Sequence, residues 1–305
     1  MMAGSLLAVF GLMTLASTSP AAPARRFFFS GDGTLTLEDA HNGEKVRARF
    51  RRVDGSYDPA ALRQLTHFLR SRSDDREGDV SLRLIEQLDY LEDLARPRHL
   101  RLASGYRSPA YNRDIRARGG QAASASLHTQ GLAADLQFDG VNIRRLWRRI
   151  RDLGCCGVGY YKDGNFLHVD VGPPRFWEAA TSKVDQNLSG GNARIFARTD
   201  FDRYEHLDGA LIRLHSVTAF PLRVAARASL IAAGTVGGVG LTPERGVQRD
   251  GECLVIAGGE EWWLRISSAD LPSSRQRLRL RLTTCEPRIE RTPEIFETNE
   301  IEITR

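Results

Sequence analysis

The feature that most constrains the fold is a strand-like alternation that carries a histidine and an aspartate on one side. In residues 166–171, aliphatic side chains alternate with His168 and Asp170. Period-two alternation is typical of a β-strand, and it places His168 and Asp170 on one face and the aliphatic residues on the other. The segment therefore predicts a sheet strand whose polar face can contribute to one metal site.

A second segment supplies further candidate ligands. His128 and Asp135 flank a turn at Gly131, and residues 133–136 are apolar enough for a buried strand apart from Asp135. Catalytic zinc sites use three protein ligands, commonly histidine and a carboxylate, and leave the fourth position for water. A lone histidine on an apolar face is more often structural, but His128, Asp135 and His168 together predict a Zn²⁺ site.

Four separated motifs carry a family resemblance. They are Ser-Gly-Tyr-Arg-Ser-Pro-Ala-Tyr-Asn at 104–112, Ser-Leu-His-Thr-Gln-Gly-Leu-Ala-Ala-Asp at 126–135, Gly-Val-Gly-Tyr-Tyr at 157–161 and His-Val-Asp-Val-Gly at 168–172. In this order they resemble the M15-type zinc peptidases, and more closely the DUF882 branch of periplasmic murein endopeptidases. The resemblance spans roughly residues 27–177 and stops there.

The resemblance implies a fold and a set of roles. The expected fold class is α+β, with an antiparallel sheet and flanking helices as in the D-Ala-D-Ala peptidases, lysostaphin and the hedgehog signalling domain. The arginine of the Tyr106-Arg107 pair contributes to the active site of such peptidases, so we assign Arg107 to catalysis and substrate binding. A guanidinium suits a substrate carboxylate or an oxyanion. Tyr106 and Ser126 are expected to bind substrate. Ser126 is expected to form a hydrogen bond in the site rather than to attack, since no Ser-His-Asp triad pattern is visible.

The general base is left open. Related peptidases often place a glutamate three residues before the last histidine ligand, and Asn165 occupies that position here. Asp170 shares a strand face with His168 and is the obvious substitute. It could equally orient an imidazole from behind. Both roles of Asp170 stay possible at this point.

These inferences predict a zinc-dependent murein peptidase that hydrolyses amide bonds in peptidoglycan stem or cross-link peptides, with D,D or L,D specificity undecided. The main alternative is a catalytically silent, zinc-stabilised module that binds the cell wall or a partner, as the hedgehog domain keeps the fold without needing peptidase activity. A secreted structural protein without metal would require three matched residues to be coincidental.

The first residues predict export. An apolar run over residues 6–15, followed by Ala22-Pro-Ala24, indicates a signal peptide at 1–24, although no Lys or Arg precedes the run. The mature protein is then expected to be periplasmic or secreted, without a transmembrane segment. The net charge of +5 comes mainly from scattered arginines. Given export, this charge favours peptidoglycan over nucleic acid as partner. The oligomeric state is not predicted.

We expect a zinc peptidase domain at 25–180, a polar linker at 181–192, and a small mainly-β domain of unknown role at 193–305. Helices are expected near 58–69, 80–94, 111–118 and 142–153, and the Asn-Gly at 42–43 predicts an edge hairpin. In the β domain, the glycine-rich residues 234–240 predict a loop, and residues 288–305 are expected to fray. Cys253 and Cys285 could pair, whereas the adjacent Cys155 and Cys156 are expected to be buried and unbridged.

Overall fold

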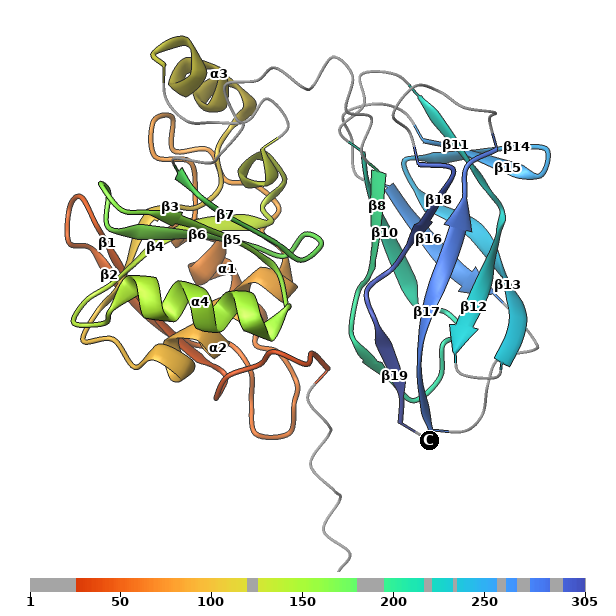
Figure 1. Ribbon diagram of the computed structural model, residues 1–305, viewed down its shortest axis with the longest axis horizontal. Coiled ribbons are helices and arrows are strands. Elements are labelled where there is room, and N and C mark those ends of the chain that lie inside the picture. The colour runs from red at the N-terminus through yellow and green to blue at the C-terminus, as the bar shows by residue number, and fades with distance from the viewer. Residues whose placement is uncertain are drawn as a thin grey trace, which may run out of the picture.

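The computed structural model describes residues 26–119, 126–179, 195–216, 221–232, 235–256, 262–267, 275–285 and 293–304. The predicted signal peptide and linker lie outside these residues. Two separate hydrophobic cores occupy the earlier and the later part of the chain, which stand beside one another in Figure 1. The α+β prediction with an added β region is confirmed, whereas the domain boundaries stay a prediction.

A seven-stranded sheet organises the first part, in the order β2-β1-β3-β4-β6-β5-β7. Its centre is antiparallel, and the β1–β3 and β5–β7 pairs are parallel. The predicted hairpin is present, with β2 at the edge. The strands are β1 (Thr34–Asp39), β2 (Lys45–Arg49), β3 (Leu100–Ser104), β4 (Ala133–Phe138), β5 (Gly157–Tyr161), β6 (Phe166–Asp170) and β7 (Arg175–Glu178).

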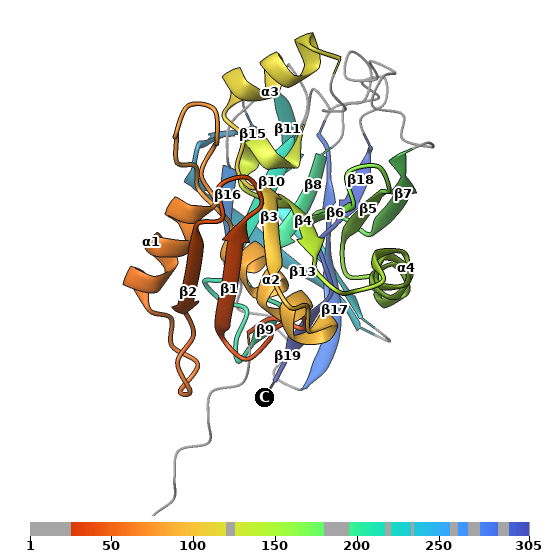
Figure 2. The same cartoon turned by 90° about the vertical axis from the view of Figure 1, so that its left-hand side faces the viewer.

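All four predicted helices form, as α1 (Pro59–Phe68), α2 (Leu82–Ala95), α3 (Pro109–Ala117) and α4 (Ile143–Leu153). Their ends carry capping residues. The Asp58 carboxylate accepts from the backbone amides of residues 60 and 61, and Asn142 accepts from the amide of residue 145. Gly154 ends α4 with a φ of 60°. Figures 1 and 2 show α1, α2 and α4 on one side of the sheet, with α1 beside β2 and α4 beside β5.

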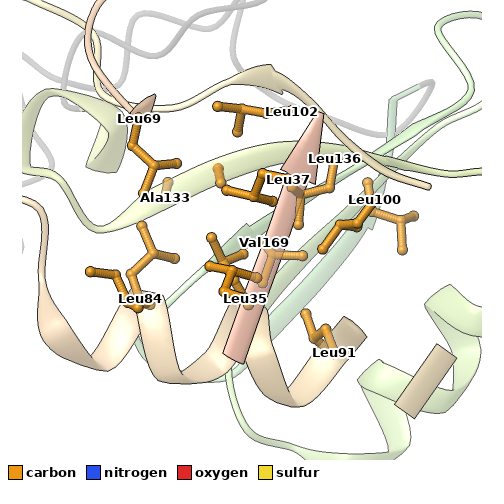
Figure 3. Close-up of a cluster of buried hydrophobic side chains, with 14 of the residues drawn as sticks. Leu35, Leu37, Leu69, Leu84, Leu91, Leu100, Leu102, Ala133, Leu136 and Val169 are labelled. Carbon is orange, nitrogen blue, oxygen red and sulfur yellow. The ribbon is translucent and has the colours of Figure 1, made fainter. Parts of the chain in front are cut away.

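The core between the sheet and these helices is aliphatic (Figure 3). Leu35 and Leu37 of β1, Leu84 and Leu91 of α2, and Leu136 of β4 are each at most 1% exposed. Burying one such side chain contributes about 1.5–3 kcal/mol. Because β4 and β6 put their aliphatic residues into this core, their alternate side chains stand on the opposite face of the sheet.

The second part is built from strands. Its nine-stranded sheet follows β8-β10-β16-β13-β12-β17-β19-β9, with β18 paired to β17, and a three-stranded sheet follows β11-β15-β14. The strands are β8 (Ile195–Thr199), β9 (Arg203–Tyr204), β10 (Leu211–Ser216), β11 (Leu222–Ala225), β12 (Arg227–Ala232), β13 (Thr235–Arg245), β14 (Val247–Asp250), β15 (Cys253–Ile256), β16 (Trp262–Ser267), β17 (Gln276–Thr283), β18 (Ile295–Glu297) and β19 (Ile301–Ile303).

Two predictions for this part are wrong. The glycine-rich run is not a loop, because Thr235 onward forms β13, the longest strand described. Gly240 lies so close to the carbonyl of Ser267 on β16 that a β-carbon would sit 2.9 Å from its oxygen, so glycine permits the pairing. The last residues do not fray throughout, because β18 and β19 both pair with β17.

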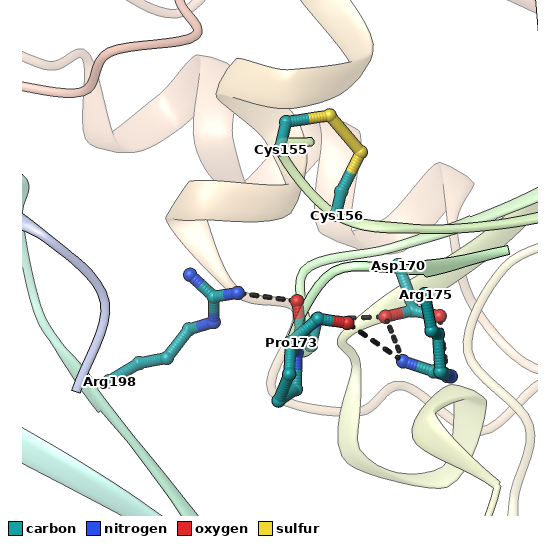
Figure 4. The surroundings of a disulfide bond; sticks show 7 residues. Cys155, Cys156, Asp170, Pro173, Arg175 and Arg198 are labelled. Atoms are coloured by element: carbon teal, nitrogen blue, oxygen red, sulfur yellow. Dashed lines mark hydrogen bonds and ion pairs between the residues drawn. A yellow bond between two sulfur atoms is a disulfide. The ribbon is translucent and has the colours of Figure 1, made fainter. Parts of the chain in front are cut away.

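The cysteines form two disulfides. Cys253 and Cys285 pair, which the sequence allowed. Cys155 and Cys156 are also bonded to each other, so the expectation of unbridged thiols is wrong (Figure 4). They lie in the irregular link between α4 and β5, where the backbone is not held in helix or strand geometry. Among the described residues, no helix is long and apolar enough to cross a membrane.

Candidate metal centre

Two adjacent strands and one turn bring the candidate ligands together. Asp135 on β4 is the direct register partner of His168 on β6. His128 lies in the short 3₁₀ helix η1 (Leu127–Gln130), which ends at Gly131 with a φ of 64°. A side chain at Gly131 would overlap the backbone of Asp79, so glycine is required there by both conformation and space. The turn thus delivers His128 to the face that holds Asp135 and His168.

The three donor atoms form a compact triangle. His128 Nε2 lies 3.1 Å from His168 Nδ1, which lies 3.0 Å from Asp135 Oδ1. His128 Nε2 is 3.3 Å from the same carboxylate oxygen. Ligands bound tetrahedrally to zinc at about 2.0–2.1 Å are separated from one another by roughly 3.3 Å. The donor triangle therefore fits a zinc ion with little adjustment.

Hydrogen bonds hold the outer nitrogens of both imidazoles. His128 donates from Nδ1 to the carbonyl oxygen of Gly105 at 2.7 Å, and His168 donates from Nε2 to Asp170 Oδ2 at 3.0 Å. When both imidazoles are neutral, as metal ligands must be, the inner nitrogens are hydrogen-bond acceptors that face a carboxylate oxygen. Burial alone would lower the pKa of His168, but its hydrogen bonds to Asp135 and Asp170 raise it, because a proton on Nδ1 separates the acceptors when no metal does. Burial and the charge of Arg107 lower the pKa of His128 to about 4, which keeps its imidazole neutral, as a metal ligand must be.

Arg107 holds the far side of Asp135. Its Nη2 donates to Asp135 Oδ2, its Nε donates to Ser104 Oγ at 2.8 Å, and its backbone amide donates to the His128 carbonyl at 3.1 Å. Burial alone would raise the pKa of Asp135, but His128 and Arg107 together hold it well below its usual range. The arginine thus leaves Oδ1 of an ionised Asp135 directed at the two histidines.

Asp170 lies behind His168, with no exposed surface. Its Oδ2 accepts from His168 and from Arg175 Nη2, at 3.0 and 2.7 Å. Its Oδ1 accepts from the amide of Gly172 and from Arg175 Nη1, at 2.8 and 3.0 Å. Burial alone would raise its pKa, but the His168 hydrogen bond and the Arg175 charge lower it to about 2. Of the two roles open to Asp170, the geometry favours orienting His168.

The remaining predicted residues lie around this centre without a defined substrate contact. Ser126 is 7% exposed, and its carbonyl accepts from the amide and hydroxyl of Thr129, so its backbone shapes the turn of η1. The Tyr106 ring packs so closely over Gly78 that a side chain there would overlap it. Asn165 lies exposed in the β5–β6 turn with a φ of 47°. Substrate binding by Ser126 and Tyr106 stays a prediction.

The sequence did not single out the aromatic wall of the site. The Trp177 ring on β7 lies 5.2 Å from the His168 ring, and its indole Nε1 donates to the Tyr161 hydroxyl at 3.1 Å. Gly159 is the register partner of Trp177, and a side chain there would overlap the indole. The sequence signal for this wall was Gly159, where the absence of a side chain makes room for the Trp177 indole. The parallel β5–β7 pairing that joins Gly159 to Trp177 was not predicted.

A second carboxylate group lies elsewhere. Asp32, Asp89 and Asp93 bring three oxygens within 4.8 Å. Arg51 already supplies a buried cation there, since its Nη2 is 3.6 Å from Asp89 and its Nε is 3.0 Å from Glu86. This group has no imidazole, whereas zinc prefers nitrogen or sulfur donors. The His128 group is therefore the better candidate for zinc.

Comparison with known proteins identifies the family of the chain. The family model described as peptidoglycan L,D-endopeptidase MepK matches residues 30–177. The chain is 37% identical over 145 residues to the peptidoglycan L,D-endopeptidase MepK of Escherichia coli (strain K12), covering 47% of this chain and 79% of that relative. It is 29% identical over 146 residues to the probable peptidoglycan L,D-endopeptidase MepK of Haemophilus influenzae, covering 47% and 78% respectively. No solved structure matches significantly. The chain thus belongs to the M15-type peptidase family that includes the MepK endopeptidases.

Proposed function

We propose that this protein is a zinc-dependent murein peptidase that cleaves peptidoglycan cross-link peptides at L,D bonds. The choice of an L,D bond follows the names of the relatives, which are L,D-endopeptidases. The observation that carries the proposal is the triangle of three potential ligand atoms, whose imidazoles are held from outside by hydrogen bonds to Gly105 and Asp170. Two imidazoles and a carboxylate that converge in this way suit a zinc ion.

His128, Asp135 and His168 would hold the zinc. When bound, zinc lowers the pKa of a coordinated water toward neutrality and polarises the scissile carbonyl. Arg107 fixes Asp135 through one oxygen, and we propose that the remaining guanidinium donors stabilise the oxyanion that forms when the amide is attacked. Donors aimed at a developing oxyanion are worth about 10²–10³ in rate.

Asp170 then acts as a positioning residue. Its carboxylate keeps the proton of His168 on Nε2, so that the Nδ1 lone pair stays available at the centre. With both oxygens engaged by His168, Arg175 and the amide of Gly172, the carboxylate is badly placed to accept a proton from a substrate-side water. Trp177 and Tyr161 form one side of the site, and we propose that they limit the peptides that can enter.

The proposed substrate implies a location outside the cytoplasm. Peptidoglycan is assembled as a wall beyond the inner membrane, so a murein peptidase has to be exported, in agreement with the signal peptide predicted at 1–24. We propose a periplasmic or secreted location, with peptidoglycan as the partner. The scattered arginines favour contact with an anionic polymer.

The test is a digest of defined cross-linked muropeptides by the metal-loaded protein, with products identified by mass. One substrate has a cross-link amide between an L and a D centre, and the other has a D,D cross-link. We expect cleavage of the L,D substrate and loss of cleavage in His128→Ala. Cleavage of the D,D substrate alone would contradict the bond assignment. A protein that binds zinc and murein but cuts neither substrate would instead be the zinc-stabilised binding module.

A further inference from the structure

The later β region contacts the segments around the metal centre, because one face of β8 and β10 is directed at the peptidase part. On β8 and β10, Phe196 pairs with His215, and Arg198 pairs with Arg213. Side chains directly opposite in a sheet share a face. The alternate residues of both strands belong to the second core. The four named side chains therefore form a second, separate face, here called the docking face.

The docking face is covered. Arg213 and His215 are 6% and 4% exposed, although they lie next to the sheet's edge strand β8 on the face away from their own core. Phe196 packs against the core of the peptidase part and stacks on His215, with ring centroids 4.6 Å apart. Arginine is almost never fully buried unless it is paired. The contacts of these side chains therefore indicate the role of the docking face.

Two of these contacts reach the turn that carries His128. His215 donates from Nδ1 to the side-chain oxygen of Gln130 at 3.0 Å, and Arg213 Nη2 donates to the Gln130 backbone carbonyl at 3.5 Å. Gln130 is the last residue of η1, two positions after His128. The β region thus holds η1 by both the side chain and the backbone of one residue.

A third contact reaches the loop that follows Asp170. Arg198 Nη2 donates to the carbonyl oxygen of Gly172, and Figure 4 shows Arg198 extending toward this loop while Asp170 pairs with Arg175 beyond it. The amide of Gly172 itself donates to Asp170 at 2.8 Å. One residue earlier, the Val171 amide donates to the Leu132 carbonyl at 3.0 Å, which ties this loop to the segment after η1.

The two held segments are the ones that orient the histidines. The turn carries His128, and the loop binds, through the amide of Gly172, the Asp170 carboxylate that orients His168. We propose that the C-terminal β region is a positioning element, in which Arg198 and His215 hold Gly172 and Gln130 and thereby fix the geometry of the metal ligands. This proposal rests on the proposed function only in taking His128, Asp135 and His168 as zinc ligands.

A separate anchor keeps the two parts together. Arg83 on α2 forms an ion pair with Asp202 through Nη1 and donates from Nη2 to the Thr199 carbonyl at 2.9 Å. Asp202 also accepts from the amide of Phe28 at 2.9 Å. Because this anchor binds α2 and the first described residues, losing Arg198 or His215 alone should leave the parts docked. The positioning effect can then be measured without separating them.

The test compares Arg198→Ala, Arg198→Lys, His215→Ala and His215→Asn in the full-length protein. Arg281→Ala is the matched control, because Arg281 pairs with Glu297 at an exposed site on β17 of the same sheet. The readouts are the rate of zinc loss to a chelator and the visible absorption spectrum of the Co²⁺-substituted protein. Both report on ligand geometry without requiring activity. The cleavage rate of the L,D muropeptide is measured on the same samples.

We expect Arg198→Ala and His215→Ala to lose zinc about 10-fold faster, at the lower end of the effect of residues behind metal ligands, and to shift the Co²⁺ spectrum. Arg198→Lys and His215→Asn, which keep one donor, should lie between these variants and the wild type. Unchanged zinc loss and spectra in folded variants would overturn the proposal, and if an alanine variant does not fold, its conservative partner decides. Faster zinc loss in a protein that cuts no muropeptide would support the positioning role while refuting the proposed function.

Discussion

Replacing Asp170 by asparagine separates the two roles that this residue could have. In either orientation, the NH₂ group of the new side chain would face two donors. In one orientation the NH₂ group would face His168 Nε2–H and Arg175, and in the other it would face the amide of Gly172 and Arg175. In the wild type these donor nitrogens lie 2.7–3.0 Å from the carboxylate oxygens of Asp170. His168 can relieve the first clash by moving its proton to Nδ1, but that proton would then occupy the lone pair that faces the other ligands.

The expected magnitude follows from this geometry. Removing an outer partner of a metal-bound histidine weakens metal binding about 10–100-fold, which is about 1.4–2.8 kcal/mol. Arg175 is 38% exposed and can turn toward water, so the loss of its ion pair adds little. At saturating zinc, the kcat of Asp170→Asn should therefore approach that of the wild type.

The assay is zinc titration of metal-free protein against a competing chelator, followed by kcat at saturating zinc. Asp163→Asn is the control, because Asp163 is exposed in the β5–β6 turn. A general base contributes about 10²–10⁴ to the rate. If Asp170→Asn binds zinc as tightly as the wild type but loses kcat by that factor, Asp170 is the base and the positioning argument is refuted.

Three further predictions concern the surroundings of the site and its scaffold. Arg107→Ala should lower kcat/KM about 100-fold or more in steady-state kinetics, because Asp135 loses the partner of its second oxygen. If only the charge of Arg107 mattered, Arg107→Lys would show wild-type rates. Asp89 has a pKa raised to about 7 by burial and nearby carboxylates, so the folded state binds more protons than the unfolded state between about pH 4 and pH 7. The free energy of unfolding should therefore fall by at most about 4 kcal/mol as the pH rises over that range. Urea unfolding of metal-free Asp89→Asn should show a weaker pH dependence than the wild type, and equal pH dependence of the two proteins would contradict the argument. Gly159→Ala should displace Trp177 and destabilise the fold by about 1–3 kcal/mol, and an unchanged tryptophan fluorescence spectrum would rule this out.

The sequence predicted those parts of the site whose signals are local. His168 and Asp170 share a face through period-two alternation, and the caps at Asp58 and Asn142 mark helices that form where expected. The pairing of Asp135 with His168 depends on the β4–β6 register, which the sequence did not predict. The roles of the ligands still rest on proposal, although the structure brings their atoms together.

The sequence failed where contacts between distant segments decide the outcome. Alternation on β8 and β10 predicts strands, but it cannot show that His215 and Arg198 face another part of the chain rather than water. Glycines usually indicate turns, and the close approach of β16 that makes Gly240 a strand residue is visible only in the folded sheet. The bond between Cys155 and Cys156 likewise overrode a rule that adjacent cysteines seldom pair.

The central claim is that a zinc ion held by His128, Asp135 and His168 makes this chain an L,D-murein peptidase. The most direct measurement is the rate of cleavage of a single L,D-cross-linked muropeptide as zinc is added in steps to the metal-free protein. The account predicts a rate that rises linearly to one equivalent of zinc and then stays constant, with no rise in His168→Ala. Cleavage that is independent of zinc, or no cleavage at any zinc level, would contradict it.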